Sequence, residues 1–448
     1  MEALIKNKLK NLGTFRFTEW ILLLFWGVTI ICIAFFTERY EHQRLFIGLG
    51  LSFGIYFYLS INALENNLRA YLVVAVLIRF ILIFSFPKLS DDIYRFIWDG
   101  RCWVNGIHPF QYTPAQLLPK SIPGLDQELF QKLNSPNYYS IYPLICQIAF
   151  YLSSFASPNN IFLNALLIKV FLFACELITL SMSLKILSLN KLPASRILWY
   201  LLNPMILLEI CGNAHFEGAM VAFLSVAIYY FMKKKSSYSA LFFSLSVASK
   251  MLTALFYPLL AFVEIAHKKL KFILQLVLFT VLLSIPLFLN LNILDSLNLY
   301  FNKFEYNASM YYLLRWVGIK LTGYNQIATI GPVLSIISTI CIILWSFLGR
   351  HKTKPTDTML WILTIYLIFA TTVHPWYLTT LLFLAIFNKY YYPIIWTSLI
   401  MLTYLNYGYD TFKESILVVF IEYFVVFAMI IYETELLKKL KLKWIQKN

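Results

Sequence analysis

The stretch EWILLLFWGVTIICIAFF, residues 19–36, carries a charged side chain at its first position and is otherwise almost entirely apolar. A straight helix needs about 20 such residues to cross the hydrocarbon core of a bilayer. Similar runs recur along the 448-residue chain, of which 60% is hydrophobic and only 13% is charged. Soluble domains usually carry about 25% charged residues, and an outer-membrane barrel would show short segments of alternating polarity. The sequence therefore predicts an all-α polytopic membrane protein.

The apolar runs predict about 12 to 14 transmembrane helices, which we assign to a single integral-membrane domain over residues 1–448. Several runs are shorter than a straight span requires, which is typical of broken helices that line a cavity. Residues 138–156 could form either a span or a re-entrant helix. Two long loops separate the apolar runs, residues 87–137 and 291–326, and long ordered loops often carry function.

The formal net charge is +15, and the basic residues gather in short runs between apolar segments, for example at residues 233–235 and 267–271. This placement follows the positive-inside rule for cytoplasmic loops, and we therefore expect no nucleic-acid partner. If each basic run lies in the cytoplasm, the order of the helices places both long loops on the extracytoplasmic side. We expect a multi-pass protein of the cytoplasmic (inner) membrane, with its functional site on the outer face, where nearly all unusual polar residues gather.

A second stretch, LSDDIYRFIWDGRCWVNGIHPFQYTP, residues 89–114, places charge beside the hydrocarbon. At about 100° per residue, a helix here puts its acids and Arg95 on one face, opposite an apolar face. The acids are Asp91, Asp92 and Asp99. Such an amphipathic helix lies in the plane of the membrane interface. The charges could form a solvated face with i,i+4 pairs worth about 0.2–0.5 kcal/mol each, but two adjacent carboxylates are also a candidate general base.

Several motifs along the chain resemble those of a known family. Ser-Asp-Asp-x-x-Arg-x-x-Trp-Asp-Gly begins at residue 90, and Gly-Ile-His-Pro-Phe begins at residue 106. Further fragments follow in the family's order: Gly-Asn-Ala-His-Phe-Glu-Gly at 212–218, a lysine at 250, Phe-Glu-Tyr-Asn-Ala-Ser at 304–309 and His-Pro-Trp-Tyr-Leu at 374–378. Together they are similar to GT-C glycosyltransferases, and above all to bacterial polyprenol-phosphate-mannose-dependent mannosyltransferases, over residues 90–390.

The resemblance implies a GT-C-like fold with amphipathic helices in its extracytoplasmic loops, and an inverting hexosyltransferase. The donor would be a sugar, mannose by resemblance, on a polyprenyl phosphate, and the acceptor would be a glycan or glycolipid. In an inverting transfer, a carboxylate removes the acceptor's proton opposite the leaving group. The resemblance assigns this role to the acid pair, with Asp91 favoured as the base and Asp92 a close alternative. Glucose, galactose and arabinose stay open as the sugar.

The leaving lipid phosphate requires nearby positive charge. Candidates for binding it are Arg95, Arg101, Lys250 and His374. For Lys250 the alternative is snorkelling to the interface, and for His374 it is a turn with interfacial aromatic anchors. Candidates for binding the sugar or the acceptor carry polar or aromatic side chains: Asp99, Asn213, His215, Glu217, Glu305, Asn307, Trp376 and Tyr377. Helix capping and hydrogen bonds between spans are the alternative for the group around residue 215.

No glycine-rich phosphate loop is visible, which favours a lipid-linked over a nucleotide-linked donor. The six cysteines are scattered without metal-ligand spacing. We assign no metal site, although the paired aspartates could hold a divalent cation. The alternative function is a transporter or flippase of a lipid-linked sugar. Such proteins often contain internal repeats, and no convincing repeat is visible here.

Overall fold

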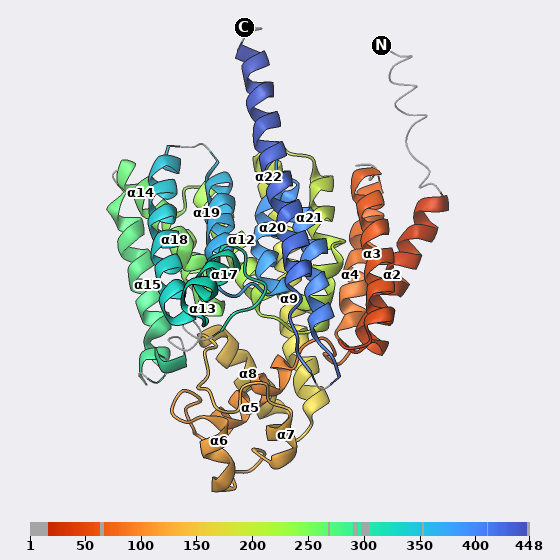
Figure 1. Ribbon diagram of the computed structural model, residues 1–448, viewed down its shortest axis with the longest axis vertical. Coiled ribbons are helices and arrows are strands. Elements are labelled where there is room, and N and C mark those ends of the chain that lie inside the picture. Colours follow the sequence, from red (N-terminus) through yellow and green to blue (C-terminus); the bar gives the residue numbers. More distant parts are fainter. Residues whose placement is uncertain are drawn as a thin grey trace.

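The computed structural model describes residues 17–62, 67–267, 269–289, 292, 294–296, 304–351, 354–409 and 411–445. Within these residues the regular structure is helical, and β interactions are limited to two isolated bridges. The predicted all-α polytopic fold is therefore confirmed. Figure 1 shows an upright bundle of helices with a smaller lobe at one end.

Six helices of the described residues are long and apolar enough to cross a membrane. They are α2 (Phe17–Phe36), α3 (His42–Asn62), α9 (Ile161–Leu189), α15 (Leu270–Phe288), α18 (Ile327–Gly349) and α22 (Ile416–Ile445). A pair of short helices over 194–212 bends by 55° at its break and counts as a seventh if it forms one span. Length and composition thus support six or seven spans, and the larger count drawn from the sequence stays a prediction.

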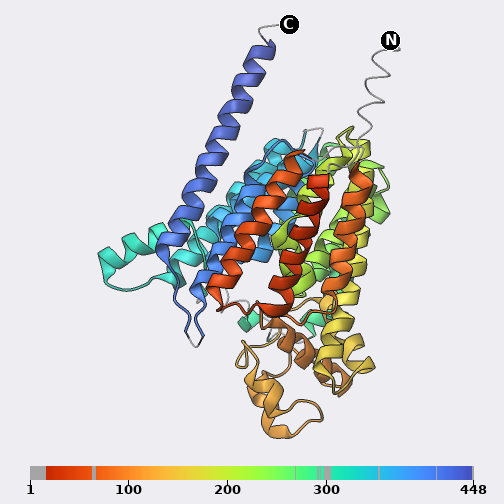
Figure 2. The same ribbon diagram turned by 90° about the vertical axis from the view of Figure 1, so that its right-hand side faces the viewer.

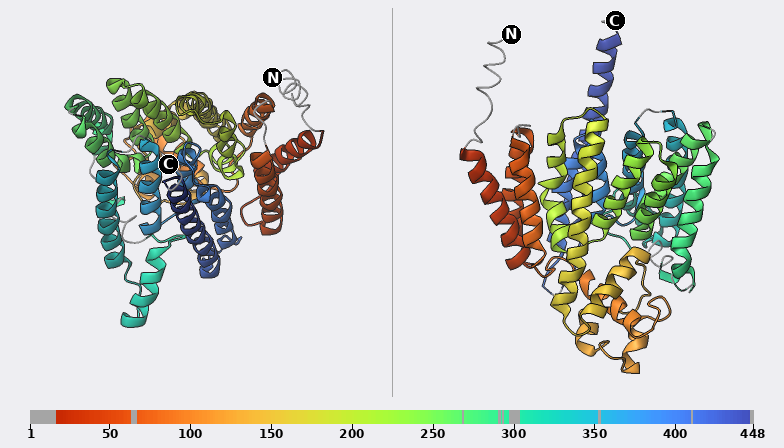
Figure 3. Two further views of the ribbon diagram at one scale, coloured as in Figure 1. Left: turned by 90° about the horizontal axis from the view of Figure 1, so that it is seen from above. Right: turned by 180° about the vertical axis from the view of Figure 1, so that it is seen from behind.

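Shorter elements complete the bundle. They are α4 (Leu68–Leu82), η3 (Ala194–Ile197), α10 (Leu198–Leu201), α11 (Pro204–Ile206), η4 (Leu207–Gly212), α12 (Glu217–Met232), α13 (Ser236–Ser249), η5 (Met251–Phe256), α14 (Tyr257–Ala266), α19 (Pro355–Phe369), η6 (Pro375–Tyr377), α20 (Leu378–Ala385), α21 (Tyr392–Leu399) and η7 (Ile400–Asn406). Seen from above, α2–α4 and the group α14, α15 and α18 lie at opposite sides of the bundle (Figure 3). α20 is fully buried, whereas α15 and α18 expose large apolar side chains, as expected where lipid is the outer solvent.

The lobe consists of α5 (Asp92–Val104), α6 (Pro114–Leu117), η2 (Leu118–Lys120), α7 (Gln127–Gln131) and α8 (Leu144–Ala156). It projects from one end of the bundle in both side views (Figures 1 and 2). The first predicted loop, residues 87–137, is therefore an ordered part of this lobe. α8 has 13 residues, too few for a straight span. Since α8 packs along α5, the ambiguous segment 138–156 belongs to the lobe and does not form a full span.

α5 is buried on both faces, which differs from the predicted amphipathic helix with one polar face toward water. Its apolar residues join a core with α8 and α9, while Arg95 and Asp99 are also buried. The reason is that the chain after α7 folds back over the polar face. Gly100 makes the contact with α8 close, because a Cβ there would stand 2.2 Å from the carbonyl oxygen of Phe150. Only glycine allows the two backbones to approach this far.

The second predicted loop, residues 291–326, is described in part, since 291, 293 and 297–303 lie outside the described residues. Its described portion includes the segment 304–309 and α17 (Met310–Thr322). Tyr306 N donates to Thr371 O (3.0 Å), and Val373 N donates to Tyr306 O (2.9 Å). These backbone bonds fix the segment 304–309 against the loop that precedes η6.

Candidate active site

A cavity of about 940 Å³ lies where the lobe meets the bundle. Its walls come from the first turn of α5, the chain between α7 and α8, the break between α13 and η5, and the loops at 372–377 and 404–412. Cavities of this size hold small ligands or the reacting ends of larger ones. Segments that are far apart in the sequence therefore contribute to a single site.

Asp91 and Asp92 lie at the N-terminus of α5 and both line the cavity. Asp91 Oδ2 lies 2.6 Å from Arg39 Nη2, and the Asp91 side chain is 36% exposed. Asn134 Nδ2 donates to Asp92 Oδ1 (2.7 Å), and Asp92 Oδ2 lies 3.8 Å from His215 Nδ1. Sequence reasoning missed Arg39, because one arginine in a turn between two spans gives no signal by itself.

A π-helical turn and a strained loop hold His215 beneath the acid pair. Glu209 belongs to η4, and its Oε2 lies 3.3 Å from His215 Nε2. Asn213 Nδ2 donates to the same Glu209 carboxylate (3.1 Å), and Asn213 Oδ1 accepts from the backbone N of Leu89 (3.3 Å). Ala214 lies between Asn213 and His215 and has a φ of +64°. This left-handed conformation costs about 1–2 kcal/mol in a residue other than glycine. Such π-turns and strained backbones cluster at functional sites.

His215 begins a series of stacked rings. Ring centroids are 3.8 Å apart between His215 and Trp376, and 4.5 Å apart between Trp376 and His374. His374 then stacks on Tyr306 at 4.6 Å. Burial lowers the pKa of His374 to about 3, so its imidazole is neutral at physiological pH. His374 lines the cavity and offers a hydrogen bond there rather than the positive charge that the sequence-based interpretation gave it.

Lys250 lies at the break between α13 and η5, where the chain is extended. Its Nζ is 2.9 Å from Glu217 Oε1, and its side chain is 25% exposed, whereas the Glu217 side chain is fully buried. Burial acts to lower the pKa of Lys250, but the Glu217 carboxylate outweighs this effect, and the pKa lies above its usual value. Lys250 therefore brings a positive charge to the cavity wall rather than snorkelling away from it.

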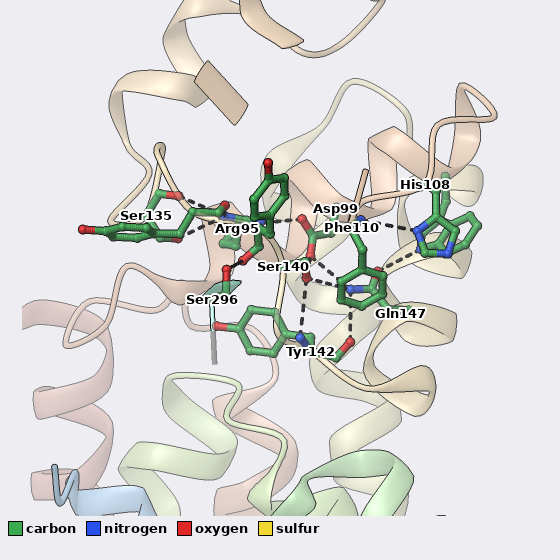
Figure 4. A network of polar contacts seen from close by, with 12 residues as sticks. Arg95, Asp99, His108, Phe110, Ser135, Ser140, Tyr142, Gln147 and Ser296 are labelled. Atoms are coloured by element: carbon green, nitrogen blue, oxygen red, sulfur yellow. Dashed lines mark hydrogen bonds and ion pairs between the residues drawn. The ribbon is translucent and has the colours of Figure 1, made fainter. Parts of the chain in front are cut away.

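Arg95 and Asp99 form a buried network that builds one wall of the cavity (Figure 4). Arg95 Nε donates to Asp99 Oδ1 (2.9 Å), and Arg95 Nη1 donates to the carbonyl oxygens of Ser135 and Tyr138 (both 2.9 Å). Gln147 Nε2 donates to the other Asp99 oxygen (3.1 Å). Arg95 lines the cavity with its Nε and Nη1 engaged in these bonds, and Asp99 does not line it. Both side chains hold the chain at 135–142 in place.

Three further candidates from the sequence lie outside the cavity lining. Arg101 Nη1 donates to the carbonyl oxygen of Gly124 within the lobe (2.6 Å). Glu305 pairs with Arg315 of α17. Asn307 Nδ2 donates to the carboxylate of Glu422 in α22 (3.2 Å). These contacts brace one element against another and do not bring the three side chains to the acid pair.

Residues 14–266 match the sequence profile of a family described as alpha-(1->6)-mannopyranosyltransferase, N-terminal domain. The chain belongs to this mannosyltransferase family. The resemblance to mannosyltransferases drawn from the sequence is therefore confirmed, and the protein is a membrane glycosyltransferase. No curated protein and no solved structure matches the chain.

The matched part of this mannosyltransferase contains Arg39, the acid pair and Lys250. The chain beyond residue 266 contributes the rings that stack on His215, which are Trp376, His374 and Tyr306. Of the residues singled out from the sequence, those that line the cavity are Asp91, Asp92, Arg95, Glu217, Lys250, His374, Trp376 and Tyr377. Asn213 and His215 form the layer directly behind them. The remaining four candidates from the sequence lie outside the cavity lining and its supporting layer; they are Asp99, Arg101, Glu305 and Asn307.

The described residues contain no group of three or more His, Cys, Asp or Glu side chains that could hold a metal ion. In this mannosyltransferase the polar neighbours of the acid pair include Arg39, Asn134 and one histidine, His215. The described part of the site therefore gives no further support for the divalent cation site that the paired aspartates suggested.

Proposed function

We propose that this glycosyltransferase moves a mannosyl group from a polyprenyl-phosphate donor to a glycan or glycolipid, with inversion, at the extracytoplasmic membrane face. The observation that carries the proposal is that candidate basic carboxylates and a cationic side chain line the same cavity. A carboxylate pair stands on one wall, and a lysine, whose charge the Glu217 carboxylate maintains, stands on another. Inverting transfer from a lipid phosphate needs a base for the acceptor and a cation for the leaving group.

Asp91 is the proposed base. It is the more exposed of the two acids, and its carboxylate is held at the cavity wall by an ion pair with Arg39. Asp92 would then orient the acceptor, because Asn134 and His215 hold its carboxylate beside that of Asp91. This assignment keeps the preference drawn from the family resemblance.

Lys250 is the proposed contact for the donor phosphate. Its ammonium group faces the cavity next to Met251 and Leu252, whose apolar side chains suit the first isoprene units of a polyprenyl chain. A fixed positive charge in a site shielded from water stabilises the negative charge that develops on the leaving phosphate. Tyr377 offers a flat apolar ring for the sugar or the lipid, whereas the faces of Trp376 are covered by His215 and His374.

The direction of the basic loops supports an outward-facing site. α13 carries Lys250 at its end, and residues 233–235 precede its start, so this basic run lies at the far end of the helix from the cavity. By the positive-inside rule, the basic end faces the cytoplasm. The cavity and the lobe would then face the other side. Membership of a transferase family favours sugar transfer over lipid transport as the outcome.

Transfer by purified variants tests the proposal. The full chain in nanodiscs would be given polyprenyl-phosphate-mannose and a synthetic mannoside, with the product followed by mass spectrometry. Loss of a general base lowers rates by about 10²–10⁴, so we expect Asp91→Asn to lose at least a hundredfold in kcat and Asp92→Asn to lose less. Glu128→Gln, which removes an exposed lobe carboxylate, is the matched control and should be unchanged. Near-native transfer by Asp91→Asn would contradict the assignment of the base.

A further inference from the structure

We propose that an aromatic platform beside the cavity, formed by Tyr40, Tyr407, Tyr409 and Phe412, binds the acceptor as a neutral hexose chain. This proposal rests on the proposed function, since the ligand is taken to be the acceptor of the transfer. None of the four rings is among the residues that the sequence singled out, and they come from two loops far apart in the chain.

The platform is held by specific contacts between these two loops. His42 Nε2 donates to the carbonyl oxygen of Tyr407 (2.6 Å), which ties the start of α3 to the chain after η7. Tyr407 forms an antiparallel bridge with Phe412, so these two residues lie side by side. Tyr40 meets Tyr409 edge to face, with 5.0 Å between ring centroids. The rings therefore have defined positions.

The platform is exposed and continuous with the cavity. Tyr409 is 78% exposed, Phe412 52% and Tyr40 38%, while Tyr407, Tyr409 and Phe412 line the cavity wall. A single exposed aromatic side chain needs no explanation, but neighbouring ones at the edge of a cavity mark a binding surface. The loop that carries Tyr409, just before α22, extends past the end of the bundle on the side of the lobe (Figure 2).

Arg39 links the platform to the proposed base. Its guanidinium carbon lies 4.9 Å from the ring centroid of Tyr407, and its Nη2 is 2.6 Å from Asp91 Oδ2. One arginine side chain therefore separates the rings from the carboxylate. A sugar chain lying on the platform would have its terminal ring beside Asp91, which is where an acceptor hydroxyl must lose its proton.

The chemistry of the platform fits a neutral carbohydrate. A hexose ring has an apolar C–H face and a rim of hydroxyl groups, and tyrosine combines a flat apolar ring with a polar tip. Tyrosine also loses little conformational entropy on binding, because it has two side-chain torsions. The carboxylate of Asp91 already balances the charge of Arg39. The remaining N–H groups of Arg39 therefore suit hydroxyl groups better than an anionic lipid headgroup. Anchoring in the membrane interface, a common role of exposed tyrosine, is the competing outcome.

Sugar binding without any donor tests the platform directly. The full chain in nanodiscs would be titrated with an α-(1→6)-linked mannotriose, and the dissociation constant measured by saturation-transfer NMR. Loss of one stacked ring corresponds to about a tenfold weaker affinity, so we expect this effect for Tyr409→Ala and near-native binding for Tyr409→Phe, which keeps the ring. Tyr324→Ala removes a tyrosine that is 64% exposed after α17 and is the matched control, with unchanged binding.

A parallel transfer assay separates this proposal from the proposed function. Tyr409→Ala should raise the KM for the acceptor by the same factor and leave the KM for the donor unchanged. If the native chain transfers mannose but Tyr409→Ala keeps its native acceptor KM and mannotriose affinity, the platform proposal is overturned while the proposed function stands. If the native chain shows no transfer, the proposed function itself fails. Poorer insertion of Tyr409→Ala into nanodiscs with native sugar affinity would identify a membrane anchor and also overturn the platform.

Discussion

At the scale of single residues, two ion pairs stand at the cavity wall. Asp91 is paired with Arg39, and Glu217 with Lys250. Burying one charge alone is costly, whereas a partner at hydrogen-bond distance offsets much of that cost. The fully buried Glu217 therefore explains how a lysine is kept charged within an apolar protein. Because of this pairing, an effect of Lys250 on stability has to be separated experimentally from its proposed contact with the donor phosphate.

A double substitution makes this separation. Lys250→Gln leaves the Glu217 carboxylate buried without its partner, which costs about 3–5 kcal/mol of stability, and it also removes the proposed phosphate contact. Adding Glu217→Gln removes the unpaired charge. We expect the double variant to recover most of the melting temperature, measured by scanning fluorimetry, while kcat/KM for the donor stays about a hundredfold below native. Recovery of both stability and activity would show that Lys250 is structural.

At the scale of elements, functional side chains lie where helices begin, end or break. The acid pair is at the start of α5, Lys250 follows the end of α13, and His215 follows the π-helical turn η4. Helix ends leave backbone groups free and let the chain change direction, so side chains there can reach a shared cavity. The close contact between α5 and α8 fixes the first of these positions.

Gly100 tests the importance of that contact. A Cβ at this position would stand 2.2 Å from the carbonyl oxygen of Phe150, so Gly100→Ala must push α5 away from α8. Overpacking of this kind costs about 1–3 kcal/mol, and we expect a lower melting temperature and reduced transfer. Gly54→Ala in α3 is the control, because a Cβ there meets no atom within 4 Å. An unchanged melting temperature for Gly100→Ala would show that the lobe adjusts without strain.

The helical fold could be predicted from the sequence, because an apolar run of span length has one stable form in lipid. The acid pair and Lys250 could be singled out for a related reason, since charges beside hydrocarbon stand out in the pattern. Pairings that depend on tertiary structure could not be read in this way. Asp99 lies in the same charged stretch as Asp91, yet its side chain is buried against Arg95 and Gln147. Arg39 reaches the site only because the turn between α2 and α3 lies beside α5.

At the scale of the whole molecule, the protein has two unlike ends. One end carries the lobe, the cavity and the aromatic platform (Figure 1), and the other carries the basic run at residues 233–235, between α12 and α13. A glycosyltransferase that uses a lipid-linked donor needs such polarity, because its donor is held in the bilayer while the acceptor arrives from the aqueous side. The cavity lies at the junction where these two substrates could meet.

The anomeric configuration of the product tests this account most directly. The native chain would be given a polyprenyl-phosphate-mannose of defined configuration and an acceptor mannoside, and the new linkage would be assigned by NMR of the purified product. A single displacement with Asp91 as base predicts a product whose configuration is opposite to that of the donor. A product that retains the donor's configuration would contradict the account, as would a donor that crosses the membrane without transferring its sugar.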